Sequence, residues 1–153
     1  MGCKVCAVNT VSTDGSCLKN PGGAIGWAWV NHDGSSASGG ARSGTNQIAE
    51  LTALYEAIVA HPGVEPLVIE SDSQYAIKCA SLWLPAWKRK GWVTASGSPV
   101  KNLALIQAID RAISERQGPV TFVWVRGHTG NHHNEIADSL AGKAAREAAG
   151  VRA

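Results

Sequence analysis

The chain of 153 residues lacks the features that define several protein classes. No apolar run approaches the roughly 18 residues of a transmembrane helix, so we expect no membrane association. Residues 1–4 lead into a strand pattern without the apolar core of a signal peptide, which favours a cytoplasmic protein. Blocks of like charge, linkers, low-complexity segments and internal repeats are also absent, and this argues against a disordered chain.

The composition is that of a globular protein. An apolar content of 44% in 153 residues is enough for one continuous core. We therefore expect a single domain over residues 1–153, with its core at about 4–149, and nothing in the sequence requires more than a monomer. The net charge of +2 is too small by itself to indicate a nucleic-acid binder.

Cysteine and histidine pairs give a superficial zinc pattern. Cys3 and Cys6 form one pair, and His128 and His132 form the other. Structural zinc sites usually take their ligand pairs from nearby turns, whereas more than 100 residues separate these two pairs. We expect Cys3 and Cys6 to be reduced thiols at the start of a strand.

Hydrophobic periodicity predicts an α/β fold. The strand at 35–43 is polar and rich in glycine, so we expect it at a sheet edge, while the nearly all-apolar strand at 120–125 is expected in the sheet interior. Strands are predicted at 11–17, 22–30, 35–43, 66–72 and 120–125. Helices are predicted from Thr45 to about His61, from Ser73 onward, at 102–113 and at about 133–149.

Four carboxylates lie on separate predicted elements. Asp14 ends the first strand, Glu50 lies in the first turn of a helix, and Asp72 ends a buried strand. Asp138 lies on the last helix, beside small residues that would let the helix approach the sheet closely. Each also has an ordinary interpretation, as a turn residue, a glutamate favoured by the helix dipole, a helix cap or a solvated side chain. If the four converge, two divalent cations about 4 Å apart would neutralise them, and oxygen ligands suit Mg²⁺ or Mn²⁺ rather than zinc.

A basic segment interrupts the chain between residues 73 and 109, where no acidic residue occurs. Basic and aromatic side chains alternate in it, which favours contact with nucleic acid. The alternative is a satellite cluster in which Trp83 and Trp87 pack together and the lysines face water. We expect both in a basic protrusion at about 82–101. The segment contains Lys78, Lys88, Arg89, Lys90 and Lys101 with Trp83, Trp87 and Trp92.

His128 lies in a glycine-flanked loop after the last predicted strand. A histidine there suits proton transfer or phosphate contact, since its pKa is near neutrality, although an exposed and idle side chain is the alternative.

Five short motifs occur in order along the chain, and together they resemble a type 1 ribonuclease H of the bacterial kind over essentially the full length. The resemblance implies a ribonuclease H-like fold, in which a mixed five-stranded sheet has helices on both faces. The motifs are Thr13–Cys17 with Asn20–Gly22, Thr45–Leu51, Ser71–Tyr75, Gly127–Gly130, and Asn134–Glu135 followed by Ala137–Asp138.

This resemblance implies endonucleolytic cleavage of the RNA strand of an RNA–DNA hybrid, leaving 3′-hydroxyl and 5′-phosphate ends. Asp14 would contact two metal ions, Mg²⁺ or alternatively Mn²⁺. Asp138 would complete the site that activates water, and Glu50 and Asp72 the site at the leaving oxygen. His128 would assist proton traffic or product release. Two other functions stay open, a non-catalytic hybrid-binding module and an integrase-like strand transferase on the same fold.

The resemblance also implies two sets of substrate contacts. Thr45 and Asn102 match two members of a DNA-phosphate pocket, but Ser43 stands where relatives carry an arginine, with Arg42 one position away. RNA would be recognised at its 2′-hydroxyl groups by Asn20, Asn46, Gln47 and Gln74, with the backbone around Gly15, Ser16 and Cys17. The DNA strand would be held by Trp83, Lys88, Arg89, Lys90 and Lys101.

Overall fold

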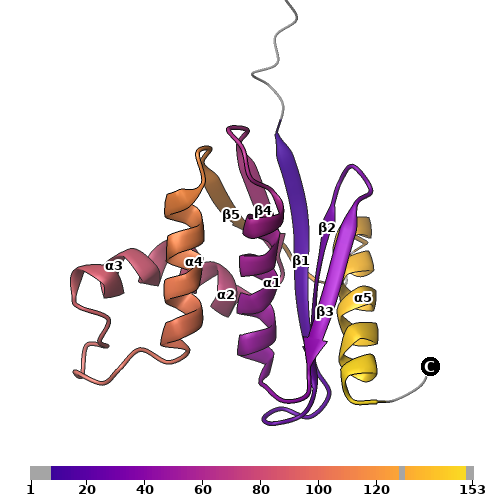
Figure 1. The fold of residues 1–153 in the computed structure, drawn as a ribbon, viewed down its shortest axis with the longest axis horizontal. Coiled ribbons are helices and arrows are strands. Elements are labelled where there is room, and N and C mark those ends of the chain that lie inside the picture. The colour runs from indigo at the N-terminus through magenta and orange to yellow at the C-terminus, as the bar shows by residue number, and fades with distance from the viewer. Residues whose placement is uncertain (1–7, 128–129, 151–153) are drawn as a thin grey trace, which may run out of the picture.

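The computed structural model describes residues 8–127 and 130–150, which form a mixed five-stranded sheet with helices around it (Figure 1). The strand order is β3-β2-β1-β4-β5. The first three strands pair antiparallel, and β4 and β5 add parallel to β1, so the predicted mixed sheet is confirmed. The strands are β1 Asn9–Cys17, β2 Ile25–Asn31, β3 Ser36–Ala41, β4 Leu67–Ser71 and β5 Val120–Trp124.

Side chains cap the N-termini of three helices. Thr45 accepts a hydrogen bond from the backbone of Ile48 at 3.1 Å, and Ser73 and Asn131 act in the same way on the helices after them. The predicted helix after β4 is divided into two short α-helices by a π-helical turn. The helices are α1 Asn46–Ala60, α2 Gln74–Lys78, the π-helix η1 Cys79–Trp83, α3 Leu84–Arg89, α4 Leu103–Glu115 and α5 His132–Ala148.

Helices cover both faces of the sheet, because two strand glycines leave room for them. A Cβ atom at Gly15 would lie 2.5 Å from the backbone nitrogen of Glu50 in α1. A Cβ atom at Gly26 would overlap the carbonyl oxygen of Ala141 in α5. Gly15 and Gly26 belong to neighbouring cross-strand pairs of β1 and β2, whose side chains point to opposite faces, so α1 and α5 lie on opposite sides.

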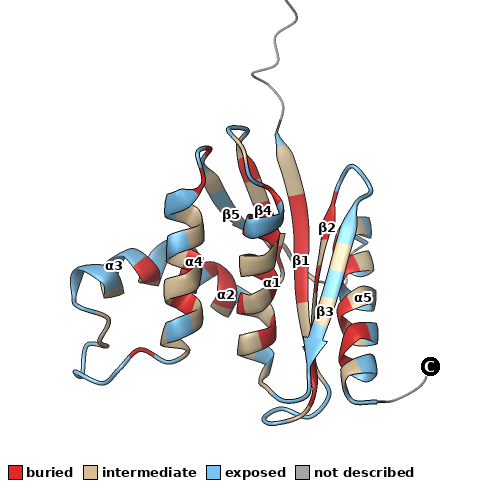
Figure 2. Cartoon of the chain, in the orientation of Figure 1, coloured by how far each residue is buried: buried red, intermediate tan, exposed pale blue. Residues whose placement is uncertain are grey.

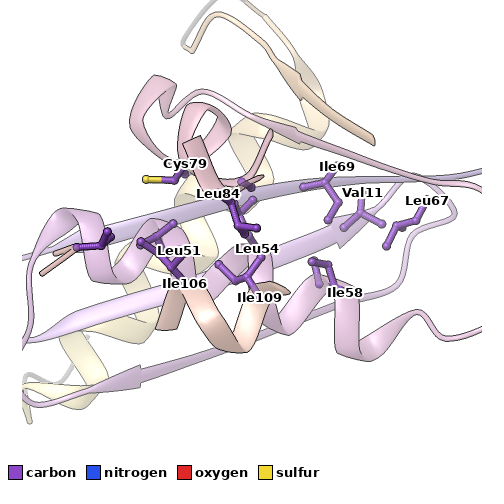
Figure 3. Close-up of a cluster of buried hydrophobic side chains, with 14 residues drawn as sticks. Val11, Leu51, Leu54, Ile58, Leu67, Ile69, Cys79, Leu84, Ile106 and Ile109 are labelled. Carbon is purple, nitrogen blue, oxygen red and sulfur yellow. The ribbon is translucent and has the colours of Figure 1, made fainter. Parts of the chain in front are cut away.

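The main hydrophobic core lies between the sheet and the pair of helices α1 and α4 (Figure 3). Trp83 and Trp87 are half-buried, with ring centroids 5.8 Å apart, and they pack against this same core. The two tryptophans therefore extend the main core, whereas the sequence suggested a separate small cluster. Figure 2 shows the contrast between the buried middle of β1 and the mostly exposed β3.

The expectation that residues 120–125 form an interior strand is wrong. β5 is an edge strand bonded to β4, and Val123 and Trp124 are 39% and 40% exposed. Phe122 packs against the core, while α5 packs against β1, β2 and β3 on the other face. The apolar run is thus covered on one face only. The predicted edge position of β3 is confirmed. In the part of the chain that the structure describes, every helix is too short or too polar to cross a membrane.

Candidate active site

Three carboxylates from three elements meet at one end of the sheet. Asp14 on β1, Glu50 on α1 and Asp72 after β4 each place an oxygen within 4.8 Å of the others. Strands β1 and β4 run parallel with Thr13 opposite Ser71, so the next residues, Asp14 and Asp72, reach the same level.

Glu50 joins this group because Gly15 lets α1 approach β1 closely. The helix begins at Asn46, and its first turn contains no acidic residue. Glu50 therefore lies in the second turn, so the predicted first-turn position is wrong. Since the helix dipole acts mainly on the first turn, it does not account for a glutamate here.

Burial and mutual repulsion raise the pKa values of two of these carboxyls. Asp14 is only 4% exposed, and burial, then the charge of Asp72, then a hydrogen bond with Asp138 raise its pKa to about 8. The backbone N–H of Gly15 donates to Asp14 at 2.9 Å and opposes the rise. Burial, followed by the charges of Asp14 and Asp72, raises the pKa of Glu50 well above its ordinary value.

These carboxylates fit a divalent metal ion. Glu50 Oε1 is buried and has no hydrogen-bond partner among residues 8–127 and 130–150. A buried acceptor without a partner is costly, and a cation beside it would remove both that cost and the repulsion among the carboxylates. An all-oxygen ligand set suits a hard divalent cation.

Asp138 lies next to this group rather than within it. It is exposed on α5, and a hydrogen bond between its side chain and that of Asp14 contributes to the raised pKa of Asp14. Ala141 and Ala145 of the same helix lie against Gly26, so small residues do let α5 approach the sheet, as predicted. Asp14 thus links the carboxylates beside α1 with the carboxylate on α5.

Comparison with known proteins gives the family. A sequence model of the RNase H family, described as "RNase H", matches residues 7–146. The chain belongs to the RNase H family. The ribonuclease H of Anaeromyxobacter dehalogenans strain 2CP-C is 44% identical over 148 residues, which cover 90% of this chain and 80% of that protein. The ribonuclease H of Pseudomonas paraeruginosa is 41% identical over 140 residues, with 90% and 93% covered.

Solved structures agree with this assignment to the RNase H family. LC9-RNase H1, a type 1 RNase H with the type 2 active-site motif, superposes with a TM-score of 0.77 at 28% identity, over 92% of this chain and 72% of that one. The PFV RNase H domain gives 0.77 at 25% identity, over 91% and 94%. The chain is therefore a type 1 RNase H, a nucleic-acid-binding hydrolase with ribonuclease H activity, as the sequence motifs predicted.

Several residues predicted to bind substrate in this RNase H gather near the carboxylates. The loops after β1 and after β3 are joined by hydrogen bonds between Gly22 and Gly44 at 2.8 Å and between Gly44 and Gly23 at 3.0 Å. Asn20 accepts a hydrogen bond from the backbone of Asn46 at 3.1 Å. These contacts bring the end of β1 and the loop after it together with the first residues of α1 and the loop before it. The predicted substrate contacts in this region are Cys17, Asn20, Thr45, Asn46 and Gln47.

Two glutamines predicted to contact RNA, Gln47 and Gln74, differ in burial. Gln47 Oε1 is buried without a hydrogen-bond partner in the described ranges, as Glu50 Oε1 is. Gln74 is exposed and begins α2, two residues after Asp72. Gln47 therefore lies on the same helix as Glu50, and Gln74 lies close in sequence to Asp72.

The basic segment extends away from the sheet through α3 and the loop after it (Figure 1). Lys88 forms an ion pair with Asp110 of α4 at 3.1 Å. Arg89, Lys90 and Lys101 are exposed, and within the described residues they form no ion pair. Their charges are available to a partner, whereas Lys88 shares its charge with α4.

Asn102 does not cap α4 with its side chain. It has a left-handed backbone conformation with φ of 61°, and its amide donates to the hydroxyl of Tyr75 at 3.1 Å. His128 lies outside the described residues, as do Cys3 and Cys6.

Two residues beside Asp72 were not predicted as part of the site. The indole N–H of Trp124 donates to the backbone carbonyl of Asp72 at 3.1 Å. A Cβ atom at Gly127 would lie 2.5 Å from Asp72 Oδ2, so the loop after β5 passes directly against this carboxylate. The sequence signal that could have indicated this contact is Gly127 itself, a glycine shortly after the strand that pairs with β4.

Proposed function

We propose that this enzyme cleaves the RNA strand of RNA–DNA hybrids internally, leaving 3′-hydroxyl and 5′-phosphate ends. The observation that carries the proposal is the group of Asp14, Glu50 and Asp72, with ligand atoms within 4.8 Å of one another and a buried Glu50 oxygen without a partner. The foamy viral protease-reverse transcriptase, whose structure was solved in complex with RNA/DNA hybrid, shares the fold at a TM-score of 0.78 and 22% identity. A monomer acting in the cytoplasm completes the proposal.

Each carboxylate has a separate role in this proposal. Two Mg²⁺ ions, or alternatively Mn²⁺, would supply Lewis acidity and a nucleophilic water when bound. Asp14 contributes to both positions, because it is grouped with Glu50 and Asp72 and also interacts with Asp138. Asp138 serves the side of the attacking water, and Glu50 and Asp72 the side of the leaving 3′-oxygen. His128 moves a proton or helps the product leave.

The RNA strand is distinguished from DNA through its 2′-hydroxyl groups in this proposal. Asn20 uses its carbonyl oxygen to accept from Asn46, which leaves its amide nitrogen to donate to the substrate. Gln47 offers the unpartnered Oε1 as an acceptor for a hydroxyl proton. The remaining contacts come from Asn46, Gln74 and the backbone at Gly15, Ser16 and Cys17.

The DNA strand is held through its phosphates. The Thr45 hydroxyl oxygen accepts a hydrogen bond from the Ile48 backbone, so its own proton can be donated to a phosphate. The Asn102 amide donates a hydrogen bond to the Tyr75 hydroxyl. Positive charge comes from the basic segment, in which Arg89 and Lys90 are exposed. The full set of proposed DNA contacts is Thr45, Trp83, Lys88, Arg89, Lys90, Lys101 and Asn102.

End-labelled RNA–DNA hybrid, duplex RNA and duplex DNA test the proposal, each incubated in Mg²⁺ and in excess chelator. Internal cuts confined to the RNA of the hybrid are expected, and both chelator and D72N should abolish them. Asparagine keeps the shape of Asp72 while removing a metal-binding charge, and S73A serves as a neighbouring control that removes only a helix cap. Binding of hybrid without cleavage would instead support the hybrid-binding module, and joining or cleavage of duplex DNA would support the strand transferase.

A further inference from the structure

Asp72 lies at the point where the two parallel strands β4 and β5 separate. Ser71 and Trp124 are paired across the strands, and the backbone N–H of Val125 donates to the Ser71 carbonyl at 2.9 Å. The next carbonyl, that of Asp72, accepts from the indole Nε1–H of Trp124 at 3.1 Å. A side chain therefore continues the backbone ladder by one residue, to the residue that carries the carboxylate.

Two further contacts restrict Asp72. The backbone N–H of Ser73 donates to Ser71 Oγ at 3.0 Å, which closes the turn around Asp72 from the β4 side. On the other side, Gly127 leaves no space for a side chain, because a Cβ atom there would lie 2.5 Å from Asp72 Oδ2 and 3.3 Å from Asp72 Cβ. Asp72 is thus held between its own turn and the end of β5.

The exposure of Trp124 makes this contact informative. At 40% exposed on an edge strand, its ring gains less from burial than a core tryptophan would. Its neighbour Val123 is similarly exposed, at 39%, but its side chain has no N–H group to donate. The property that separates Trp124 from an ordinary apolar edge residue is its N–H donor, which points at Asp72.

We propose that Trp124 is a positioning residue, whose indole fixes the backbone of Asp72 so that the carboxylate meets Asp14 and Glu50. Gly127 completes the arrangement by giving the Asp72 side chain room. This inference rests on the proposed role of Asp72 as a metal ligand. Loss of one hydrogen bond of this kind weakens the response to metal by about three- to tenfold.

The test compares W124F with wild type and with V123A, the matched edge-strand control. The thermal melting midpoint is measured as Mg²⁺ is added, which needs neither substrate nor turnover. W124F should require about three- to tenfold more Mg²⁺ for half of the full shift, and V123A should match wild type. In a D72N background, W124F should add no further change, because it acts through Asp72.

Hybrid cleavage gives a second readout for W124F. At a fixed, limiting Mg²⁺ concentration, kcat should fall while KM for hybrid stays unchanged, since a positioning residue does not touch the substrate. The variant G127A provides an independent route, because it displaces the same carboxylate while leaving Trp124 intact, and it should weaken the Mg²⁺ response at least as much.

Each other outcome overturns the inference in an identifiable way. An unchanged Mg²⁺ requirement in W124F would refute the positioning role while the proposed function stands. A raised KM with unchanged kcat would make Trp124 a substrate contact instead. Wild type without any melting response to Mg²⁺ would remove the metal site itself, and the proposed function would fail together with the inference.

Discussion

Replacing Asp14 by asparagine should stabilise the metal-free enzyme at neutral pH, although it removes a central residue of the active site. Asp14 is buried beside Glu50 and Asp72, and these surroundings raise its pKa from 3.8 to about 8. Asparagine has nearly the same shape, carries no charge and can keep the hydrogen bond from the Gly15 backbone. It also removes the charge that contributes most, after burial, to raising the pKa of Glu50.

The sign of the effect follows from proton linkage. A carboxyl whose pKa is raised by folding contributes its full stability below its unfolded value, and this contribution is lost as the pH rises through the folded value. For Asp14 that window extends from about pH 4 to about pH 8. At about 1.4 kcal/mol per pH unit, the roughly three units up to pH 7 set an upper limit of about 4 kcal/mol. Water entry and side-chain relaxation reduce this, so we expect about 1–3 kcal/mol.

Thermal unfolding in excess chelator at pH 5 and pH 7 provides the measurement. D14N should melt higher than wild type at pH 7, by about 2–4 °C per kcal/mol, with a smaller difference at pH 5. D33N is the control, because hydrogen bonds from Ser35 lower the pKa of the exposed Asp33, so D33N should bring no gain at pH 7. The reasoning from the raised Asp14 pKa would be refuted if D14N were no more stable than wild type at pH 7. It would also be refuted if the melting temperature of D14N exceeded that of wild type by the same amount at pH 5 and pH 7.

Two further predictions concern packing and charge. Gly26→Ala should destabilise the fold by about 1–3 kcal/mol, since its Cβ would overlap the Ala141 carbonyl. Gly142→Ala should instead stabilise α5 by up to about 1 kcal/mol, because its Cβ meets only the flexible end of a side chain. Urea unfolding measures both changes, and equal effects of the two variants on the free energy of unfolding would contradict the close approach of α5 to the sheet. The double variant R89A/K90A should weaken hybrid binding and reduce the slope of log affinity against log salt by about 1–2, as measured by fluorescence anisotropy. An unchanged slope would assign both residues to the solvated surface.

Residues at the ends of elements made the carboxylate group predictable. Asp72 follows β4 as predicted, whereas the prediction that Asp14 ends the first strand is wrong, because β1 continues to Cys17. Asp14 still lies beside Asp72, because the parallel pairing of β1 with β4 ends at Thr13 and Ser71. The position of Glu50 beside these two carboxylates was harder to predict from the sequence, because it depends on the close approach of α1 to β1 at Gly15.

Features that depend on distant partners could not be predicted. The apolar run at β5 indicates burial on average, but its edge position is set by its pairing with β4, and one of its faces is exposed because α5 packs over β1, β2 and β3 instead. The bond from Trp124 to Asp72 joins residues 52 positions apart, and no local pattern reveals it. The π-helical turn before α3 likewise has no simple signature in spacing.

The two faces of the sheet are built from very different side chains. Large aliphatic residues fill the space beneath α1 and α4, whereas α5 meets β2 and β3 through alanines and glycines. Contacts between such small groups remove little apolar surface from water, so α5 is held less by hydrophobic burial than by the fit of its backbone. We therefore expect local opening of α5 to cost less than global unfolding and to carry Asp138 away from Asp14 while the larger core stays intact. On this expectation, a molecule can keep its native core while its active site is transiently disassembled, so that loss of activity need not mean loss of the fold.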